Sequence, residues 1–350
     1  MLVEGLFLPL TTPFSADGRV NLLKLEHNVA LYSKTPAAGL VVLGSNGEAT
    51  LLTEEEAREV MRASIESAAA EKVMLADVSK DSVAATVGLA EYAARLGYDA
   101  VVVGVPSILR GEETRKELKI YFEMVADRSP LPLMLASGVD AQHGRIDENL
   151  VVSLARHCNV LGVVDAAGGA EAIAALKAGT ADVDREVMVT AVFTAVTGRM
   201  VRQNSNDGSF VSVSMLSEGP GAVATLPARP AIKTRTKRVG FQILSGSSAR
   251  MLEGLREGAR GAVPRFGVCA PQACFEVLAA WKDSDEGLAA EKQARIVDAA
   301  TRIEAQTGVA GIKYGCDLNG YYGGWTRLPF LPLCGEERSL VELLMQGIRS

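Results

Sequence analysis

Polar residues that could do chemistry follow three short apolar runs of the sequence. Ser45 opens a Ser-Asn-Gly-Glu turn after residues 39–43, Asp77 and Lys80 lie at and just beyond the end of residues 73–77, and His143 follows residues 131–136. A lysine amine can act as a nucleophile and a histidine as a general base, and Asp77 could pair with Lys80. Taken singly, a strand-to-helix turn, a solvated lysine and a surface histidine explain the same residues. Their interpretation therefore depends on the fold that positions them.

The chain alternates short apolar runs with longer stretches of helical periodicity. Each run is apolar on consecutive positions, which is typical of parallel strands buried on both faces. The runs lie at residues 6–10, 39–43, 73–77, 100–105, 131–136, 160–164, 241–245 and 261–263. Eight such strand–helix units predict an α/β fold, the (β/α)8 TIM barrel, with an open doubly wound sheet as the alternative. The first strand is followed by no dinucleotide-binding fingerprint, which weakens that alternative.

Two regions depart from the regular alternation. We predict a barrel over residues 1–270 with an irregular insertion at about 179–232, and a C-terminal helical segment over 271–350 packed on the barrel. The insertion is rich in Val, Thr, Ser, Gly and Ala, which indicates either a hairpin or a poorly ordered loop. Residues 289–306 and 339–348 have the pattern of additional helices.

Composition excludes several classes of function. Charged residues make up 22% of the chain and apolar residues 48%, which is ordinary for a globular protein, and the net charge is −6. Nucleic acid and anionic lipid surfaces both require a cationic face, so neither is expected as a partner. The sequence contains no apolar run of eighteen residues, so we expect no membrane span.

The five cysteines and three histidines give no sign of a metal centre. No cysteine pair has the C-x-x-C spacing, and the histidines are scattered, so we expect neither a metal nor a cofactor. Reduced thiols in a cytoplasmic protein are the simplest interpretation. The N-terminus enters an apolar run at once, without the features of a signal or transit peptide.

Several motifs together resemble the dihydrodipicolinate synthase / N-acetylneuraminate lyase family of pyruvate-type aldolases. The closest likeness is to its branch of 4-hydroxy-2-oxoglutarate aldolases and fungal 2-keto-3-deoxy-sugar-acid aldolases, which carry the same Ser-Asn-Gly-Glu turn. The resemblance covers nearly all of the chain except the insertion. The motifs are the opening at residues 8–14 with Asp17-Gly18, the turn at 45–48, the segments 127–132, 159–165 and 244–247, and the Gly-Tyr-Tyr-Gly-Gly of residues 320–324.

The resemblance implies a Schiff-base mechanism whose residues are not matched here. A sixth-strand lysine of the family attacks the ketone of pyruvate, and alignment of Gly162-Val163 places Val164 at that position. The fifth-strand tyrosine that relays protons corresponds to Ala136. The tyrosine pair after the fourth strand is replaced by residues 107–109, and no arginine is visible at 139–144. No catalytic residue of the family mechanism is therefore intact.

What the resemblance leaves in place is the turn that, in the family, holds the substrate carboxylate through hydroxyl and backbone N–H groups. Ser45, Asn46 and Gly47 are accordingly the expected substrate-binding residues. We expect a small carboxylate or 2-oxo acid such as pyruvate as ligand, and a homo-oligomer, dimer or tetramer, as in the family. Three hypotheses remain: a carboxylate-binding barrel that has lost Schiff-base catalysis, an active lyase or hydratase that uses Lys80, Asp77 or His143, and a non-catalytic interaction protein.

Overall fold

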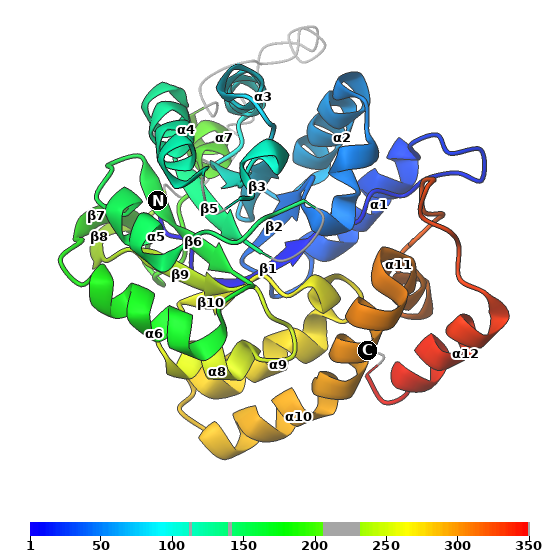
Figure 1. The fold of residues 1–350 in the computed structure, drawn as a ribbon. Helices are drawn as coiled ribbons and strands as arrows, with labels where there is room; N and C mark the ends of the chain where they lie inside the picture. Colours follow the sequence, from blue (N-terminus) through cyan, green and yellow to red (C-terminus); the bar gives the residue numbers. More distant parts are fainter. Residues whose placement is uncertain (112–113, 139–141, 206–231, 349–350) are drawn as a thin grey trace, which may run out of the picture.

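A closed barrel of eight parallel strands forms the centre of the protein (Figure 1). The computed structural model describes residues 1–111, 114–138, 142–205 and 232–348. Around the barrel the strands follow the order β1-β10-β9-β6-β5-β4-β3-β2. They are β1 Gly5–Pro9, β2 Gly39–Val42, β3 Val73–Asp77, β4 Ala100–Gly104, β5 Leu133–Ser137, β6 Val160–Asp165, β9 Gln242–Ser245 and β10 Gly261–Ala262. The predicted (β/α)8 fold and the position of each predicted strand are confirmed.

A helix follows each barrel strand and covers the outside of the barrel (Figure 1). These helices are α1 Leu22–Ser33, α2 Glu54–Ser67, α3 Val83–Leu96, α4 Arg115–Arg128, α5 Glu148–Leu154, α6 Gly169–Gly179, α8 Met251–Arg256 and α9 Pro271–Lys282. Local sequence fixes some of their ends. Thr53 Oγ1 accepts the amide of Glu56, and the Glu56 carboxylate accepts the amide of Thr53, so a capping box begins α2.

Two separate apolar layers stabilise the barrel. One fills the space between strands and helices, where fully buried residues such as Leu40, Val103 and Phe122 pack. The other fills the barrel interior and includes Phe7 and Met134, with Val164 packed against it. Because side chains alternate along a strand, one apolar run supplies both layers. This explains why the strands read as continuous apolar runs in the sequence.

α9, the first helix of the predicted C-terminal segment, covers the barrel, and the rest of that segment adds helices beside it (Figure 1). They are α10 Glu286–Arg302, the π-helical turn η7 Ile303–Thr307, α11 Gly308–Leu318 and α12 Gly335–Leu344. The stretches predicted as additional helices, 289–306 and 339–348, overlap α10 and α12 respectively. α11 lies against η6 Arg265–Val268, the short 3₁₀ helix that follows β10, so the segment reaches the C-terminal end of the barrel strands.

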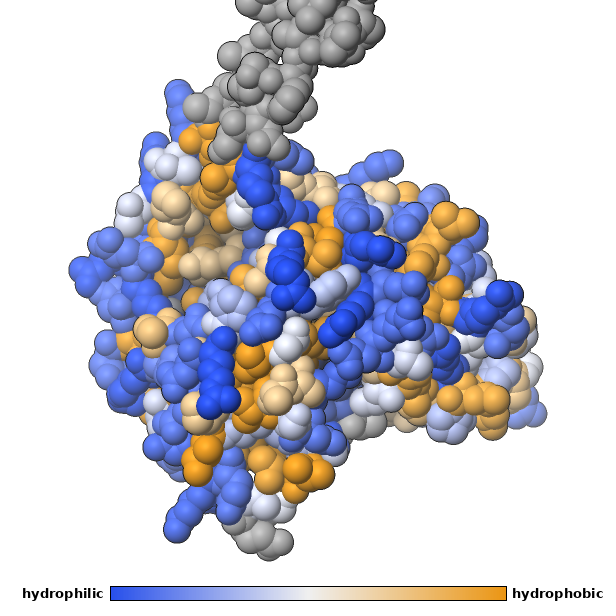
Figure 2. Space-filling model, turned by 90° about the horizontal axis from the view of Figure 1, so that it is seen from above, coloured by the Kyte–Doolittle hydropathy of each residue, from blue (hydrophilic) through white to orange (hydrophobic). Residues whose placement is uncertain are grey.

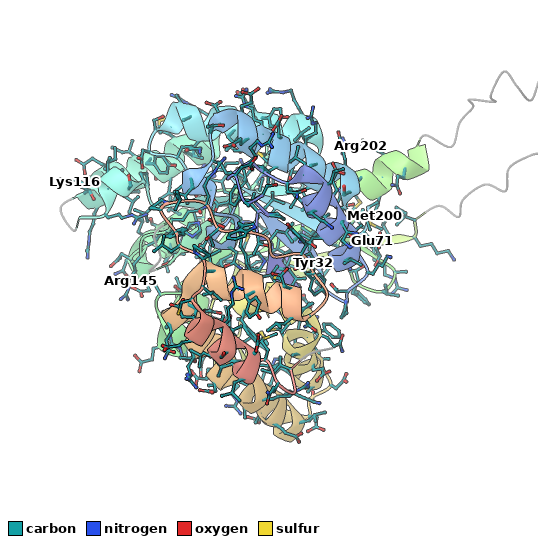
Figure 3. The ribbon with its side chains drawn as sticks, turned by 90° about the vertical axis from the view of Figure 1, so that its right-hand side faces the viewer. Tyr32, Glu71, Lys116, Arg145, Met200 and Arg202 are labelled. Atoms are coloured by element: carbon teal, nitrogen blue, oxygen red, sulfur yellow. The ribbon has the colours of Figure 1, made fainter. Side chains whose placement is uncertain are left out.

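The described part of the predicted insertion contains strand β7 and helix α7, and the partner strand β8 follows just beyond its predicted end. β7 Arg185–Thr190 pairs with β8 Thr234–Val239, and α7 Gly198–Ser205 lies between them in sequence, on the side of the barrel where Glu71 lies (Figure 3). Val187, Val189 and Val239 pack with Leu2. Because the hairpin follows α6 and precedes β9, it lies at the N-terminal end of the barrel strands. Residues 206–231, the rest of the predicted insertion, lie outside the described residues.

The surface mixes polar and hydrophobic side chains without a single extended apolar band on the face shown in Figure 2. Among the described residues, no helix is both long and apolar enough to cross a membrane.

All five cysteines are free, and Cys158 and Cys334 are the exposed ones.

Candidate active site

A small cavity of about 70 Å³ lies at the C-terminal end of the barrel strands. Its floor is the last apolar layer of the barrel, formed by side chains of β2, β4, β5 and β6 and of the residue after β10. They are Val41, Val102, Ala136, Val164 and Val263. The remaining wall of the cavity includes polar residues, namely Ser45, Asp77, Ser137, His143 and Arg265. The site therefore combines a hydrocarbon base with a polar mouth.

Val164, the residue that the resemblance places at the Schiff-base position, faces this cavity. It pairs in register with Ala136 on β5 and with Leu244 on β9. Val164 is the one residue of β6 that is not fully buried, because its isopropyl group borders the cavity. Among the described residues that line the cavity, none is a lysine.

Ser45, His143 and Asp77 form a continuous hydrogen-bonded chain at the mouth. Ser45 Oγ lies 3.2 Å from His143 Nδ1, and His143 Nε2 lies 2.6 Å from Asp77 Oδ2. The other carboxylate oxygen of Asp77 accepts the amide and the hydroxyl of Ser79 at 3.0 and 2.6 Å. The His143 side chain is 10% exposed and that of Asp77 is 1% exposed. The interpretation of His143 as a surface residue is therefore wrong.

A glycine on β4 makes room for the imidazole. A Cβ at Gly104 would lie 2.5 Å from His143 Cδ2, a distance that real Cβ contacts essentially never show. The Gly104 amide also donates to Ser79 Oγ at 2.8 Å. Gly104 thus helps to hold the Ser45–His143–Asp77 hydrogen-bonded group in place, through its amide and through the space left by its missing side chain.

Lys80, the third residue of the alternative constellation, lies beside a different cavity. This second cavity, of about 280 Å³, is bordered by Asp77, Lys80 and Ser107 but not by His143. Asp77 belongs to both cavities, and its two oxygens are engaged by His143 and Ser79 as described above. The structure brings Asp77 and His143 together and leaves Lys80 outside the barrel mouth.

Of the three expected substrate-binding residues, Ser45 borders the mouth cavity, whereas Asn46 and Gly47 lie behind it. The Asn46 side-chain amide donates to the carbonyls of Pro9 and Arg265 at 3.0 and 2.8 Å. Asn46 Oδ1 accepts Arg265 Nε at 3.1 Å, so this buried side chain fixes the direction of the guanidinium. The carbonyl of Gly47 accepts the Thr12 hydroxyl at 2.7 Å.

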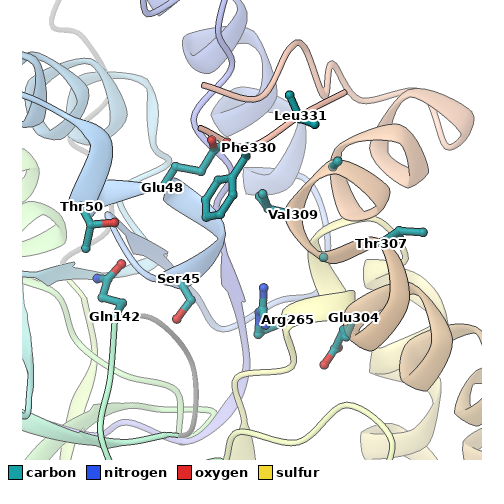
Figure 4. A pocket seen from close by; sticks show the side chains of 12 residues that line it. Ser45, Glu48, Thr50, Gln142, Arg265, Glu304, Thr307, Val309, Phe330 and Leu331 are labelled. Carbon is teal, nitrogen blue, oxygen red and sulfur yellow. The ribbon is translucent and has the colours of Figure 1, made fainter. Parts of the chain in front are cut away.

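A larger outer cavity of about 320 Å³ adjoins the mouth, and Ser45 and Arg265 line both (Figure 4). Thr50, Gln142, Glu304 and Thr307 add polar groups, while Phe330 and Leu331 add apolar side chains from the C-terminal segment. The outer cavity is thus enclosed jointly by the barrel loops and the C-terminal segment.

Glu304 brings a carboxyl group to this outer cavity from the π-helical turn. Burial raises the pKa of Glu304, and this is partly offset by bonds from Ser248 and the Phe266 amide and by the charge of Arg265. Glu304 Oε1 accepts the Ser248 hydroxyl at 2.5 Å and the Phe266 amide at 2.9 Å. π-helical turns are often found at functional sites, because they redirect one side chain of a helix.

Two other charged residues near the site have structural roles. Asp165, at the end of β6, accepts the Gly168 amide at 3.1 Å, and burial raises the pKa of its carboxyl group. Lys313 Nζ lies 2.5 Å from Glu48 Oε1 and donates to the Trp325 carbonyl at 2.6 Å. Burial lowers the pKa of Lys313, although the Glu48 carboxylate opposes this shift.

Arg265 and Glu304 are the site residues that sequence reasoning missed. Arg265 follows the weakest of the predicted strands, and Glu304 lies in a stretch predicted only as a packing helix. The available signal for Arg265 was its position one turn past the end of a barrel strand, where functional residues of such barrels lie.

The closed barrel and the polar groups at the C-terminal ends of its strands define a TIM-barrel protein with a polar site at the barrel mouth. The chain belongs to the Dihydrodipicolinate synthetase family, which it matches over residues 2–185 and 222–347. This family match confirms the resemblance from which the expected site residues follow.

Similar proteins include aldolases and synthases of this family. The chain is 25% identical over 358 residues to L-threo-3-deoxy-hexylosonate aldolase from Hypocrea jecorina, covering 99% of this chain and 95% of that protein. The solved structure of dihydrodipicolinate synthase DapA-2 from Bacillus anthracis has a TM-score of 0.77 at 20% identity and covers all of both chains. That of YagE from E. coli K12, in complex with pyruvate, has a TM-score of 0.75 at 22% identity and covers 99% of both.

Proposed function

We propose that this protein binds a small 2-oxo acid such as pyruvate at the barrel mouth without forming a Schiff base. The observation that carries the proposal is the side chain of Val164, which borders the cavity where the family mechanism needs a lysine amine. An isopropyl group can neither attack a ketone nor move a proton. Pyruvate itself is suggested by family membership and by the pyruvate complex of YagE.

The polar mouth offers a cation and a hydroxyl for the carboxylate. Arg265 presents a guanidinium that Asn46 orients through Nε, and a guanidinium suits planar carboxylates. Ser45 adds a hydroxyl on the same wall. In this proposal Asn46 and Gly47 position the turn, Arg265 and Ser45 contact the ligand, and the apolar floor receives the methyl group.

A thermal-shift series with 2-oxo acids tests binding. Pyruvate should stabilise the wild type, by about 2.7 kcal/mol at a concentration 100 times Kd. Arg265→Met should abolish the stabilisation, whereas Arg128→Met, at an exposed helix end, should retain it. No stabilisation of the wild type by any 2-oxo acid would contradict the proposal.

Borohydride reduction in the presence of pyruvate tests the absence of a Schiff base. The wild type should give no stable adduct on any residue of the barrel mouth when its peptides are mapped by mass spectrometry. An adduct on Lys80 would instead establish that this amine has taken over the role of the family lysine.

A second candidate function is an active lyase or hydratase, favoured by the 2.6 Å contact between His143 and Asp77. A buried imidazole–carboxylate pair can serve as a general base. Exchange of the methyl protons of pyruvate in D₂O, followed by NMR, would reveal such a base. Exchange at the same rate with the wild type and with His143→Gln would exclude it.

Self-association forms part of the proposal. Ile108 lies on the short helix η3 Ser107–Leu109, which follows β4, and 69% of this apolar residue is exposed. In many members of the family, residues at this place reach a neighbouring subunit. Light scattering of the purified protein and of Ile108→Asp tests this; loss of an oligomer in the variant would support it, and a monomeric wild type would contradict it.

A further inference from the structure

The geometry points to a second activity: we propose that Ser45 is a nucleophile for hydrolysis of short acyl esters or thioesters, with His143 as base and Asp77 orienting it. A nucleophilic hydroxyl requires a base within hydrogen-bonding reach and a third group that fixes the base. Ser45 Oγ is 3.2 Å from His143 Nδ1, and His143 Nε2 is 2.6 Å from Asp77 Oδ2. The proposal uses the same cavity but does not depend on binding of a 2-oxo acid.

Neighbouring groups hold Asp77 and His143 of this hydrogen-bonded triad in place. Asp77 Oδ2 faces His143, while Oδ1 is held by Ser79, so the carboxylate cannot rotate without losing bonds. In the neutral tautomer whose Nε2 donates to the Asp77 carboxylate, Nδ1 carries no proton and can accept that of Ser45. Gly104 leaves space for the ring. The burial of Asp77 and His143 keeps water from competing for these bonds.

Ser45 lies at the junction of two cavities that suit the two halves of an ester. The inner cavity of about 70 Å³ has an apolar floor and admits an acyl group the size of acetyl. The outer cavity of about 320 Å³ is larger and lined by both polar and apolar side chains, and it can hold the leaving group. Arg265 lines both cavities, and in this proposal its positive charge stabilises the oxygen that becomes negative during attack.

The reaction balances without a cofactor. Ser45 Oγ bonds to the acyl carbon while its proton passes to His143 Nδ1; the bond from the acyl carbon to the leaving oxygen or sulfur then breaks, and the leaving group takes that proton. Water then attacks the acyl carbon while His143 takes its proton; the bond between the acyl carbon and Ser45 Oγ breaks, and Oγ regains the proton from His143 as the carboxylic acid leaves. No electrons are transferred to or from an external group.

Labelling with a fluorophosphonate probe, followed by peptide mapping, tests the nucleophile in the full-length protein. Label should appear on Ser45 in the wild type and be lost from this peptide in Ser45→Ala. Ser153→Ala, an exposed helix serine, serves as the matched control and should label as the wild type does. Absence of label from Ser45 in the wild type would overturn the proposal.

The variant Asp77→Asn tests whether the hydrogen bonds that join Ser45, His143 and Asp77 serve catalysis or only stabilise the structure. Asparagine can keep the bond from Ser79, but its amide would donate to His143 Nε2, which forces the ring proton onto Nδ1. His143 could then no longer accept the proton of Ser45, so labelling should slow about 100-fold or more. An unchanged labelling rate in a folded Asp77→Asn protein would contradict the assigned roles.

Substrate length provides an independent measurement. p-Nitrophenyl acetate should be hydrolysed faster by the wild type than by Ser45→Ala, and p-nitrophenyl octanoate should be a poor substrate because the inner cavity is short. Equal rates for the wild type and Ser45→Ala with the acetate would refute the activity. Pyruvate binding is read from thermal shifts, so either proposal can fail while the other stands.

Discussion

Lys313 Nζ lies 2.5 Å from Glu48 Oε1, and the two side chains are 1% and 0% exposed. Glu48 ends the Ser-Asn-Gly-Glu turn in a left-handed conformation with φ 51°, and its other oxygen accepts the Arg327 amide at 2.9 Å. Lys313 lies on α11, so this ion pair attaches the C-terminal segment to the turn that carries Ser45. The outer cavity depends on that attachment, because it is bordered by both parts.

Lys313→Met should destabilise the protein strongly. Removing one partner of a buried ion pair leaves the other charge without compensation, which costs about 3–5 kcal/mol. The double variant Lys313→Met/Glu48→Gln should recover part of this loss, since no uncompensated charge remains. Urea unfolding of the wild type, both single variants and the double variant provides the comparison. Additive single effects would show that the two residues do not act as a pair.

Val164→Lys should introduce the missing amine into the barrel. The lysine would start from the register position opposite Ala136 and Leu244, and its Nζ would be flanked by hydrocarbon, which lowers the pKa of an amine. Pyruvate with borohydride should then give a stable adduct on residue 164. Val164→Met, of similar length but without an amine, is the control. A folded Val164→Lys protein without an adduct would mean that the cavity does not admit the ketone near β6.

Much of the fold follows from the sequence because the signal is local and repeated. Each barrel strand is a continuous apolar run, and the capping box at Thr53 and Glu56 marks its helix directly. The hairpin of β7 and β8 was only one of two alternatives. Its return strand β8 has exposed Thr234, Arg235 and Thr236, so it lacks the apolar run by which the buried strands are recognised.

The site could be predicted only where it coincides with a motif. Ser45 was found because its turn resembles that of the family. The burial of His143 depends on Gly104, which lies on a neighbouring strand, and no local pattern connects the two positions. Arg265 is oriented by Asn46, more than 200 residues away in sequence. Such pairings arise from barrel closure, so a single sequence does not contain them as a pattern.

Glu56→Gln should remove stability at neutral pH and have no effect in acid. The bonds from Arg327 are the main reason why the pKa of Glu56 falls from 4.5 to about 2. A lowered pKa in the folded state gives stability that is present above pH 4.5 and is lost as the pH falls toward 2. Gln can keep the capping-box bond from the Thr53 amide, but it loses the charge and one of the two bonds from Arg327. We expect a loss of about 1 kcal/mol at pH 7, since the pair is partly exposed. Urea unfolding from pH 7 to 2.5, with Glu55→Gln as control, measures it; a pH-independent difference would contradict the assignment.

Glu304→Gln should show the opposite pH dependence. Because burial raises the pKa of Glu304 above its usual 4.5, the folded state binds this proton more tightly than the unfolded state does. Stability from this group is therefore complete below pH 4.5 and falls as the pH rises through the raised pKa. Gln retains an oxygen for the Ser248 hydroxyl and the Phe266 amide but cannot ionise.

The free energy of unfolding of Glu304→Gln, relative to the wild type, should therefore increase between pH 4 and pH 8. Urea unfolding at several pH values measures this trend, and Glu336→Gln, at an exposed position of α12, provides the control. If the difference instead decreases as the pH rises, the Glu304 carboxylate is stabilised in the folded protein. The charge of Arg265 would then outweigh burial, and Arg265 would be neutralised by Glu304 rather than available to a ligand carboxylate.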